Sequence, residues 1–129
     1  MSSVPPEIST FSFAWTPSSR LRSVNAPNAC CIDGWEELVP NTTDASGEKH
    51  VPVIEEDGRS VSVKVGSVEH PMLAAHYITC IVIETSQGYQ KKNLRPGEKP
   101  AAHFALAEGE KLLAAYEYCN LHGLWMANV

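Results

Sequence analysis

Apolar and polar side chains alternate along residues 59–65, and this pattern constrains the fold more than any other feature of the sequence. Val61, Val63 and Val65 would lie on one face of an extended strand, with polar residues on the other face. Residues 51–54 form an apolar, β-branched segment just before it, and the turn residues 56–58 separate the two. The sequence therefore predicts a β-hairpin here.

Further short strands are predicted after this hairpin. Residues 77–85 are rich in β-branched side chains, residues 89–94 follow a Gln87-Gly88 turn, and residues 101–106 alternate, with Phe104 and Leu106 inward. Residues 111–118 have the apolar content of a strand or a short helix, and the turns around them favour a strand. Short, closely spaced strands separated by Gly and Pro turns predict an all-β fold, an antiparallel β-sandwich.

The first third of the chain has weaker signals. Several prolines interrupt residues 1–29, and residues 10–15 are one possible short strand. We therefore expect a short irregular N-terminal segment in front of the sandwich. The whole chain, at 129 residues and 43% hydrophobic, suits a soluble globular protein with one main domain.

Composition also excludes some classes of partner. The formal net charge of −5 argues against a nucleic-acid partner, which would require a basic surface. No segment approaches the roughly 20 apolar residues that cross a bilayer, and the first residues lack the features of a signal peptide. We expect a cytoplasmic protein with reduced thiols and no membrane partner.

Residues that bind metals lie beside predicted turns. One histidine precedes the first strand of the hairpin, two others bracket a five-residue loop, and a Cys-x-x-His motif lies in a tight turn near the C-terminus. Imidazole and thiolate are ligands for iron, zinc and copper. The candidate ligands are His50, His70, His76, Cys119 and His122.

The number of these ligands favours iron over zinc. Structural zinc takes four ligands in a tetrahedron, so five donors exceed what it requires. Four imidazoles in a plane and one thiolate on the axis would leave one open position on iron, and the thiolate would push electron density toward that position. The fifth histidine, His103, lies in an alternating strand opposite Phe104 and is predicted to be an exposed polar residue.

Two charged residues, Glu48 and Lys49, directly precede His50. A solvated ion pair is the ordinary interpretation of such a dipeptide. If the iron site exists, Lys49 would attract an anionic substrate and help to protonate it, and Glu48 could cap the vacant position of the oxidised metal.

Four segments of the sequence resemble the superoxide reductase family, which includes desulfoferrodoxin and neelaredoxin. They agree with the family in order and spacing, and the resemblance covers about residues 41–125. The segments are Glu48-Lys49-His50-Val51-Pro52-Val53-Ile54-Glu55, Val65-Gly66-Ser67-Val68-Glu69-His70-Pro71-Met72, His76-Tyr77-Ile78 and Tyr118-Cys119-Asn120-Leu121-His122-Gly123-Leu124-Trp125.

The resemblance implies an immunoglobulin-like sandwich over residues 41–129 that binds one mononuclear iron per chain. It implies that the histidines at 50, 70, 76 and 122 are equatorial ligands and that Cys119 is axial. Lys49 would assist substrate attraction and protonation, and Glu48 would bind the ferric state. Superoxide would be reduced to hydrogen peroxide, with rubredoxin or a similar small protein restoring the ferrous form. Family members are commonly homodimers or tetramers.

The N-terminal segment departs from the family. Two-iron members hold a second, rubredoxin-like iron with a Cys-x-x-Cys and a later Cys-Cys pair. Cys30 and Cys31 match the later pair, but the earlier pair is missing. Residues 1–40 are therefore predicted to be a metal-free remnant of a desulforedoxin-like domain. Cys80 stands where the family usually has an aromatic residue and is predicted to be a small buried apolar residue.

Other functions remain to be weighed against this one. An oxygenase of the common type uses two histidines and one carboxylate and leaves several positions open. A dismutase would work without an external reductant. An iron-binding electron-transfer protein or a structural metal module would need no open coordination position.

Overall fold

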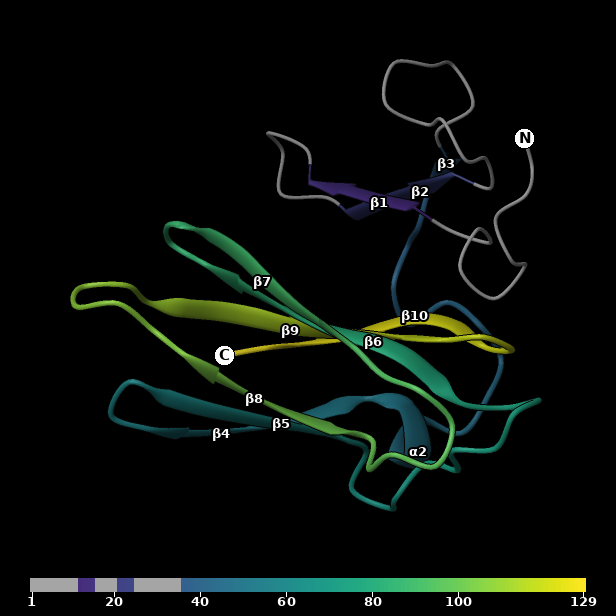
Figure 1. Ribbon diagram of the computed structural model, residues 1–129. Helices are drawn as coiled ribbons and strands as arrows, with labels where there is room; N and C mark the ends of the chain where they lie inside the picture. The colour runs from purple at the N-terminus through teal and green to yellow at the C-terminus, as the bar shows by residue number, and fades with distance from the viewer. Residues whose placement is uncertain (1–11, 16–20, 25–35) are drawn as a thin grey trace. The chain divides into compact units, whose positions relative to one another are not determined.

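The computed structural model describes residues 12–15, 21–24 and 36–129, and the chain divides into two compact units, Met1–Val39 and Pro40–Val129. The first unit contains a small antiparallel sheet of β1 (Ser12–Trp15), β2 (Leu21–Val24) and β3 (Glu36–Glu37) (Figure 1). Strand β1 lies within the segment predicted at residues 10–15, whereas β2 and β3 are not predicted. Cys30 and Cys31 lie outside the described residues.

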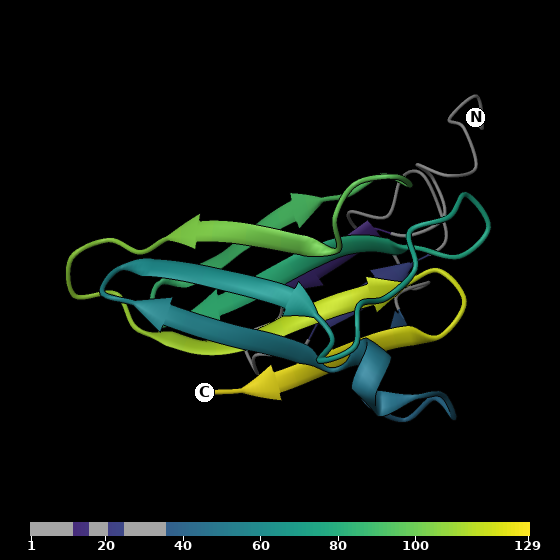
Figure 2. The ribbon, with the colours of Figure 1, turned by 90° about the horizontal axis from the view of Figure 1, so that it is seen from below.

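The second unit is a sandwich of two antiparallel sheets, seen edge-on in Figure 1 and from the three-stranded side in Figure 2. One sheet has the strand order β10-β9-β6-β7 and the other has the order β4-β5-β8. This arrangement confirms the predicted immunoglobulin-like antiparallel sandwich. The strands are β4 (Pro52–Asp57), β5 (Ser60–Val65), β6 (Ile78–Thr85), β7 (Gly88–Asn93), β8 (Ala101–Ala105), β9 (Leu112–Cys119) and β10 (Gly123–Asn128).

The hydrophobic core lies between the two sheets, where alternation along the strands directs the apolar side chains. Val61, Val63 and Val65 of β5 are all buried, as predicted, and they pack in one cluster with Ile81 and Ile83 of β6. Complete burial of one such side chain contributes about 1.5–3 kcal/mol to stability. The core therefore fixes the register of both sheets.

Several single-residue predictions are confirmed. Phe104 packs partly against the core, and Leu106 is buried within it. His103 is exposed, and its Nδ1 lies 2.9 Å from Ser62 Oγ on the neighbouring strand. Cys80 is buried, and burial raises the pKa of its thiol to about 11. Residues 111–118 correspond to strand β9, so the choice of strand over helix is correct.

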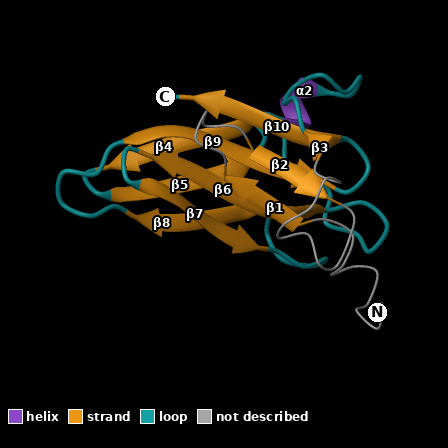
Figure 3. Cartoon of the chain, turned by 90° about the horizontal axis from the view of Figure 1, so that it is seen from above, coloured by secondary structure: helices purple, strands orange, loops and turns teal. Residues whose placement is uncertain are grey.

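Strand β10 and one helical turn, α2 (Gly47–His50), are not predicted from the sequence. The turn α2, the 66–77 connection and the 120–122 turn gather at one end of the sandwich (Figures 2 and 3). A register shift between Ile78 and Cys80 marks a β-bulge where β6 pairs with β9 at this end. Bulges are frequent next to functional sites. Among the described residues, no helix is long and apolar enough to span a membrane.

Candidate metal centre

The turn α2 presents Glu48, Lys49 and His50 at the end of the sandwich. An isolated four-residue helix is not stable in water, so tertiary contacts must hold it. The carbonyl oxygen of Glu48 accepts hydrogen bonds from Val68 N at 3.0 Å and from Ser67 Oγ at 3.2 Å. A Cβ on Gly66 would lie 2.5 Å from the same oxygen, so only glycine permits this close approach. The result is a fixed turn with Glu48 and Lys49 exposed and His50 buried.

Hydrogen bonds to carbonyl groups fix the orientation of two of the imidazole rings. His50 Nδ1 donates to Ser46 O at 2.6 Å, and His70 Nδ1 donates to Pro71 O at 2.6 Å. Because a carbonyl oxygen only accepts, both Nδ1 atoms carry the proton and both Nε2 atoms are free to bind a metal. This carbonyl–histidine arrangement is typical of metal-binding histidines.

The four imidazole rings form a square. Neighbouring ring centroids lie 4.7 Å apart for His50 and His70, 4.6 Å for His70 and His76, 5.0 Å for His76 and His122, and 4.8 Å for His50 and His122. The diagonal from His50 to His76 is 6.5 Å, close to √2 times the sides. Four similar sides and such a diagonal place the four rings around one central point.

Cys119 lies at the end of β9, fully buried as part of the hydrophobic core. Its Sγ lies 3.6 Å from His70 Nε2 and 3.8 Å from His122 Nδ1. Burial raises the pKa of this thiol, and backbone hydrogen bonds from Leu121 and His122 act in the opposite direction. The sulfur therefore approaches the histidine square from its core side.

The electrostatics of the site favour neutral imidazoles. Burial lowers the pKa of His70 to about 4, and it also lowers the pKa values of His50 and His76. Repulsion from neighbouring rings adds to each shift, and the charge of Lys49 adds to those of His50 and His76. Neutral rings are the form that binds a metal.

The donor atoms fit a single metal ion. One atom from each of the five predicted ligands lies within 4.8 Å of all the others. His50 Nε2 and His70 Nε2 are 3.2 Å apart, yet neither carries the proton when Nδ1 donates to a carbonyl, so two lone pairs face each other. Among the described residues, His76 Nε2 is buried with no hydrogen-bond partner. A cation at the centre would satisfy all of these atoms, and the mixture of four imidazoles and one thiolate suits iron.

Some residues around the centre carry no clear signal in the sequence. The ring of Trp125 stacks on His50 with centroids 4.9 Å apart, and Trp125 Nε1 donates to His122 O at 3.1 Å. Asn120 connects two of the ligand loops. Glu117 is fully buried two residues before Cys119, and only its position on the inward face of β9 could have indicated this.

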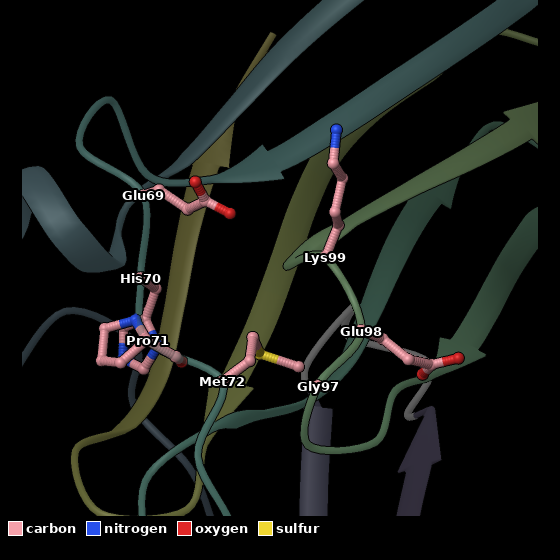
Figure 4. Close-up of a pocket in the computed structure, with 7 residues that line it drawn as sticks. All are labelled: Glu69, His70, Pro71, Met72, Gly97, Glu98 and Lys99. Carbon is pink, nitrogen blue, oxygen red and sulfur yellow. The ribbon is translucent and has the colours of Figure 1, made fainter.

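A pocket of about 420 Å³ opens beside His70, lined by residues 69–72 and 97–99. Figure 4 shows Met72 extending between His70 and Gly97, with Glu69, Glu98 and Lys99 around it. His70 is the one member of the five-residue cluster in its lining. Two carboxylates against one ammonium do not favour an anion, so this pocket is a poor entrance for a negatively charged substrate.

Comparison with known proteins agrees with this geometry. Residues 42–128 match the family model described as Desulfoferrodoxin. A desulfoferrodoxin of Syntrophotalea carbinolica is 48% identical over 96 residues, which are 74% of this chain and 75% of that protein. The superoxide reductase of Treponema pallidum superimposes with a TM-score of 0.72 at 38% identity, over 91% of this chain and 99% of that one. A one-iron superoxide reductase of Giardia intestinalis gives a TM-score of 0.56 at 34% identity, over 64% of this chain and 97% of that one. With its sandwich and its five converging donors, the chain belongs to the desulfoferrodoxin family.

Proposed function

We propose that this chain is a superoxide reductase, which adds one electron and two protons to superoxide and releases hydrogen peroxide. The observation that carries the proposal is the square of four imidazoles with the buried sulfur of Cys119 on its core side. Relatives named superoxide reductase, from Treponema pallidum and Giardia intestinalis, share the fold at 38% and 34% identity.

In this proposal, His50, His70, His76, His122 and Cys119 hold one mononuclear iron. Iron bound there supplies the single electron that the reaction needs. The donor atoms are Nε2 of His50, His70 and His76, Nδ1 of His122, and Sγ of Cys119, because these atoms face one another across the site. Since Cys119 lies on the core side, the opposite side of the square is where substrate binds.

Lys49 and Glu48 are the residues that we assign to the substrate side. Both are exposed, and Lys49 is close enough to lower the pKa values of His50 and His76. An ammonium group there attracts the superoxide anion and stabilises the negative charge of the product as it is protonated. Glu48 on the same turn would offer a carboxylate oxygen to an oxidised iron, because a hard ferric ion favours an anionic oxygen ligand.

Several further features belong to the same proposal. A small donor such as rubredoxin returns the electron after each turnover, the protein acts in the cytoplasm, and it assembles as a homodimer or a tetramer. Residues 1–40 form a metal-free remnant of a desulforedoxin-like domain. The superposition on the Treponema pallidum enzyme covers 91% of the chain, which is a larger share than Pro40–Val129 makes up. This coverage supports an N-terminal unit related to that of the Treponema pallidum enzyme.

The proposed function is tested by metal content, spectrum and reaction of the purified protein. We expect one iron per chain, one thiolate-to-ferric absorption band that appears on oxidation, and superoxide consumption that depends on an external reductant. Zinc without a band would identify a structural module instead. Iron with no reaction toward superoxide would favour an electron carrier, and a second, rubredoxin-like set of bands would contradict the metal-free N-terminal unit.

Replacing Lys49 by alanine is expected to slow the reaction with superoxide by at least about tenfold, because both attraction and proton supply are lost. The second-order rate constant is measured by pulse radiolysis at several ionic strengths, and the variant should show a weaker dependence on salt. Iron content and the absorption band should not change.

Lys64→Ala is the matched control, since Lys64 is an exposed lysine that contributes no candidate ligand; it is the penultimate residue of β5 and pairs with Val53 and Ala101. Its rate constant should equal that of the wild type. A wild-type rate constant for Lys49→Ala would remove Lys49 from the reaction.

A further inference from the structure

Asn120 lies in the turn between Cys119 and His122, and it binds the chain on both sides of His76. Its Nδ2 donates to Ala75 O at 3.0 Å, and its Oδ1 accepts from Tyr77 N at 2.9 Å. Its own backbone N–H donates to Tyr77 O at 3.1 Å. One residue therefore joins the segment that carries His76 to the turn that carries two other ligands.

The need for such a connection follows from how the rings are held. Hydrogen bonds from Nδ1 to a carbonyl group fix His50 and His70 directly. His76 has no such ring bond within the described part of the chain, and its Nε2 is buried without a partner. Its backbone pairs reciprocally with Leu73, which closes the loop on itself but does not join it to the rest of the site.

The regular ladder between β6 and β9 reaches this region but does not include His76. Its last pair is Ile78 with Cys119, next to a β-bulge. Asn120 continues the connection beyond that pair by using its side-chain amide where the ladder has ended. Three hydrogen bonds, two donated and one accepted by Asn120, thus help to fix the position of His76 relative to Cys119 and His122.

We propose that Asn120 is a positioning residue of the metal centre, which clamps the His76 segment to the Cys119–His122 turn. The inference rests on the proposed iron site and adds a residue that contributes no donor atom. Without the clamp, the segment that carries His76 would lose its hydrogen bonds to the turn that carries Cys119 and His122. Residues that orient metal ligands typically affect metal affinity by 10–100-fold.

Asn120→Ala tests the clamp against a matched control, Asn41→Gly. The side-chain amide of Asn41 also makes one donated and one accepted hydrogen bond with the backbone, in this case both with Met126. Its Nδ2 donates to Met126 O at 3.2 Å, and its Oδ1 accepts from Met126 N at 2.9 Å. Glycine is the suitable replacement there because Asn41 has φ of +63°. Both asparagines are exposed, so the two variants lose similar hydrogen bonds at different places.

The measurements are the release of iron from the loaded protein into excess chelator, the charge-transfer band, and the melting temperature. We expect Asn120→Ala to release iron roughly tenfold faster and to shift or broaden the band. Asn41→Gly should match the wild type in both, with a comparable loss of melting temperature. Equal release rates in the two variants, or a wild-type rate and band in Asn120→Ala, would overturn the proposal.

Asn120→Asp keeps the test valid if the alanine variant does not fold. Its carboxylate can still accept from Tyr77 N but cannot donate to Ala75 O, so its release rate should exceed that of the wild type. A wild-type rate for this variant also counts against the clamp. Iron release is measured without superoxide, so this test is independent of the proposed function. A chain that binds iron but does not reduce superoxide would contradict the proposed function, and the release rates would still confirm or overturn the role of Asn120.

Discussion

A Cys119→Ser variant is expected to lose the sulfur-to-iron charge-transfer band completely and to keep its fold. Cys119 Sγ is the sulfur that lies against the histidine square, within 3.6 Å of His70 Nε2 and 3.8 Å of His122 Nδ1. A serine hydroxyl fits the same position but is a poor anionic donor, so electron donation from the core side disappears. Superoxide reduction should fall with the band, because Cys119 would supply the anionic sulfur ligand of a bound iron.

The matched control for this variant is Cys80→Ser. Cys80 is also buried, lies on the adjacent strand β6 and pairs with Tyr118, and burial raises its thiol pKa to about 11. This variant loses a thiol of the same kind but should keep the band unchanged. We compare the two proteins by absorption spectra for the band, by iron content for metal binding, and by circular dichroism for the fold. An oxidised Cys119→Ser protein that retained the band would assign the sulfur ligand to another cysteine.

The strands of the sandwich could be predicted because alternation and turns mark them independently of tertiary contacts. Strand β5 shows this well, because polar residues separate Val61, Val63 and Val65. Gly58 lies in the turn before the strand, and Gly66 directly follows it. Strand β10 lacks this mark because Leu124 and Trp125, on opposite faces, are both buried. The turn α2 has no helical periodicity to detect, and contacts with residues 66–68 hold it in place.

The candidate site could be predicted to the level of residue types but not of atoms. Spacing and chemistry predict five candidate ligands, and the structure brings all five together. Which nitrogen faces the metal depends on carbonyl groups such as those of Ser46 and Pro71, which no sequence pattern identifies. The clamp of Asn120 depends on a β-bulge and a loop closure, so it is visible only in three dimensions.

Glu117 is the other residue whose burial is not among the predictions from the sequence. It pairs with Ile81 of β6 and Trp125 of β10, and residues directly opposite each other share one face of a sheet. Ile81 belongs to the core, so Glu117 also points between the sheets, where it is fully buried. Within the described part of the chain neither of its carboxylate oxygens has a hydrogen-bond partner. Burial raises the pKa of Glu117 to about 9.

This raised pKa makes the stability of the protein depend on pH. Below the ordinary pKa of 4.5, Glu117 is protonated in both the folded and the unfolded chain, so its titration does not change the free energy of unfolding. Between pH 4.5 and about 9 the folded chain keeps a proton that the unfolded chain has released. The free energy of unfolding therefore falls by about 1.4 kcal/mol for each pH unit in this window. At neutral pH the loss amounts to about 3 kcal/mol.

Glu117→Gln is therefore expected to stabilise the iron-free protein by about 3 kcal/mol at pH 7, roughly a hundredfold in the folding equilibrium. Glutamine keeps the shape of the neutral acid and does not titrate, so the variant and the wild type should be equally stable near pH 4.5 and diverge steadily above it. Urea unfolding of both proteins across this range measures the difference, and iron is removed first because its charge would add to the local field. Parallel profiles for the two proteins would mean that Glu117 is ionised in the folded state and that a compensating partner, rather than burial alone, governs its titration.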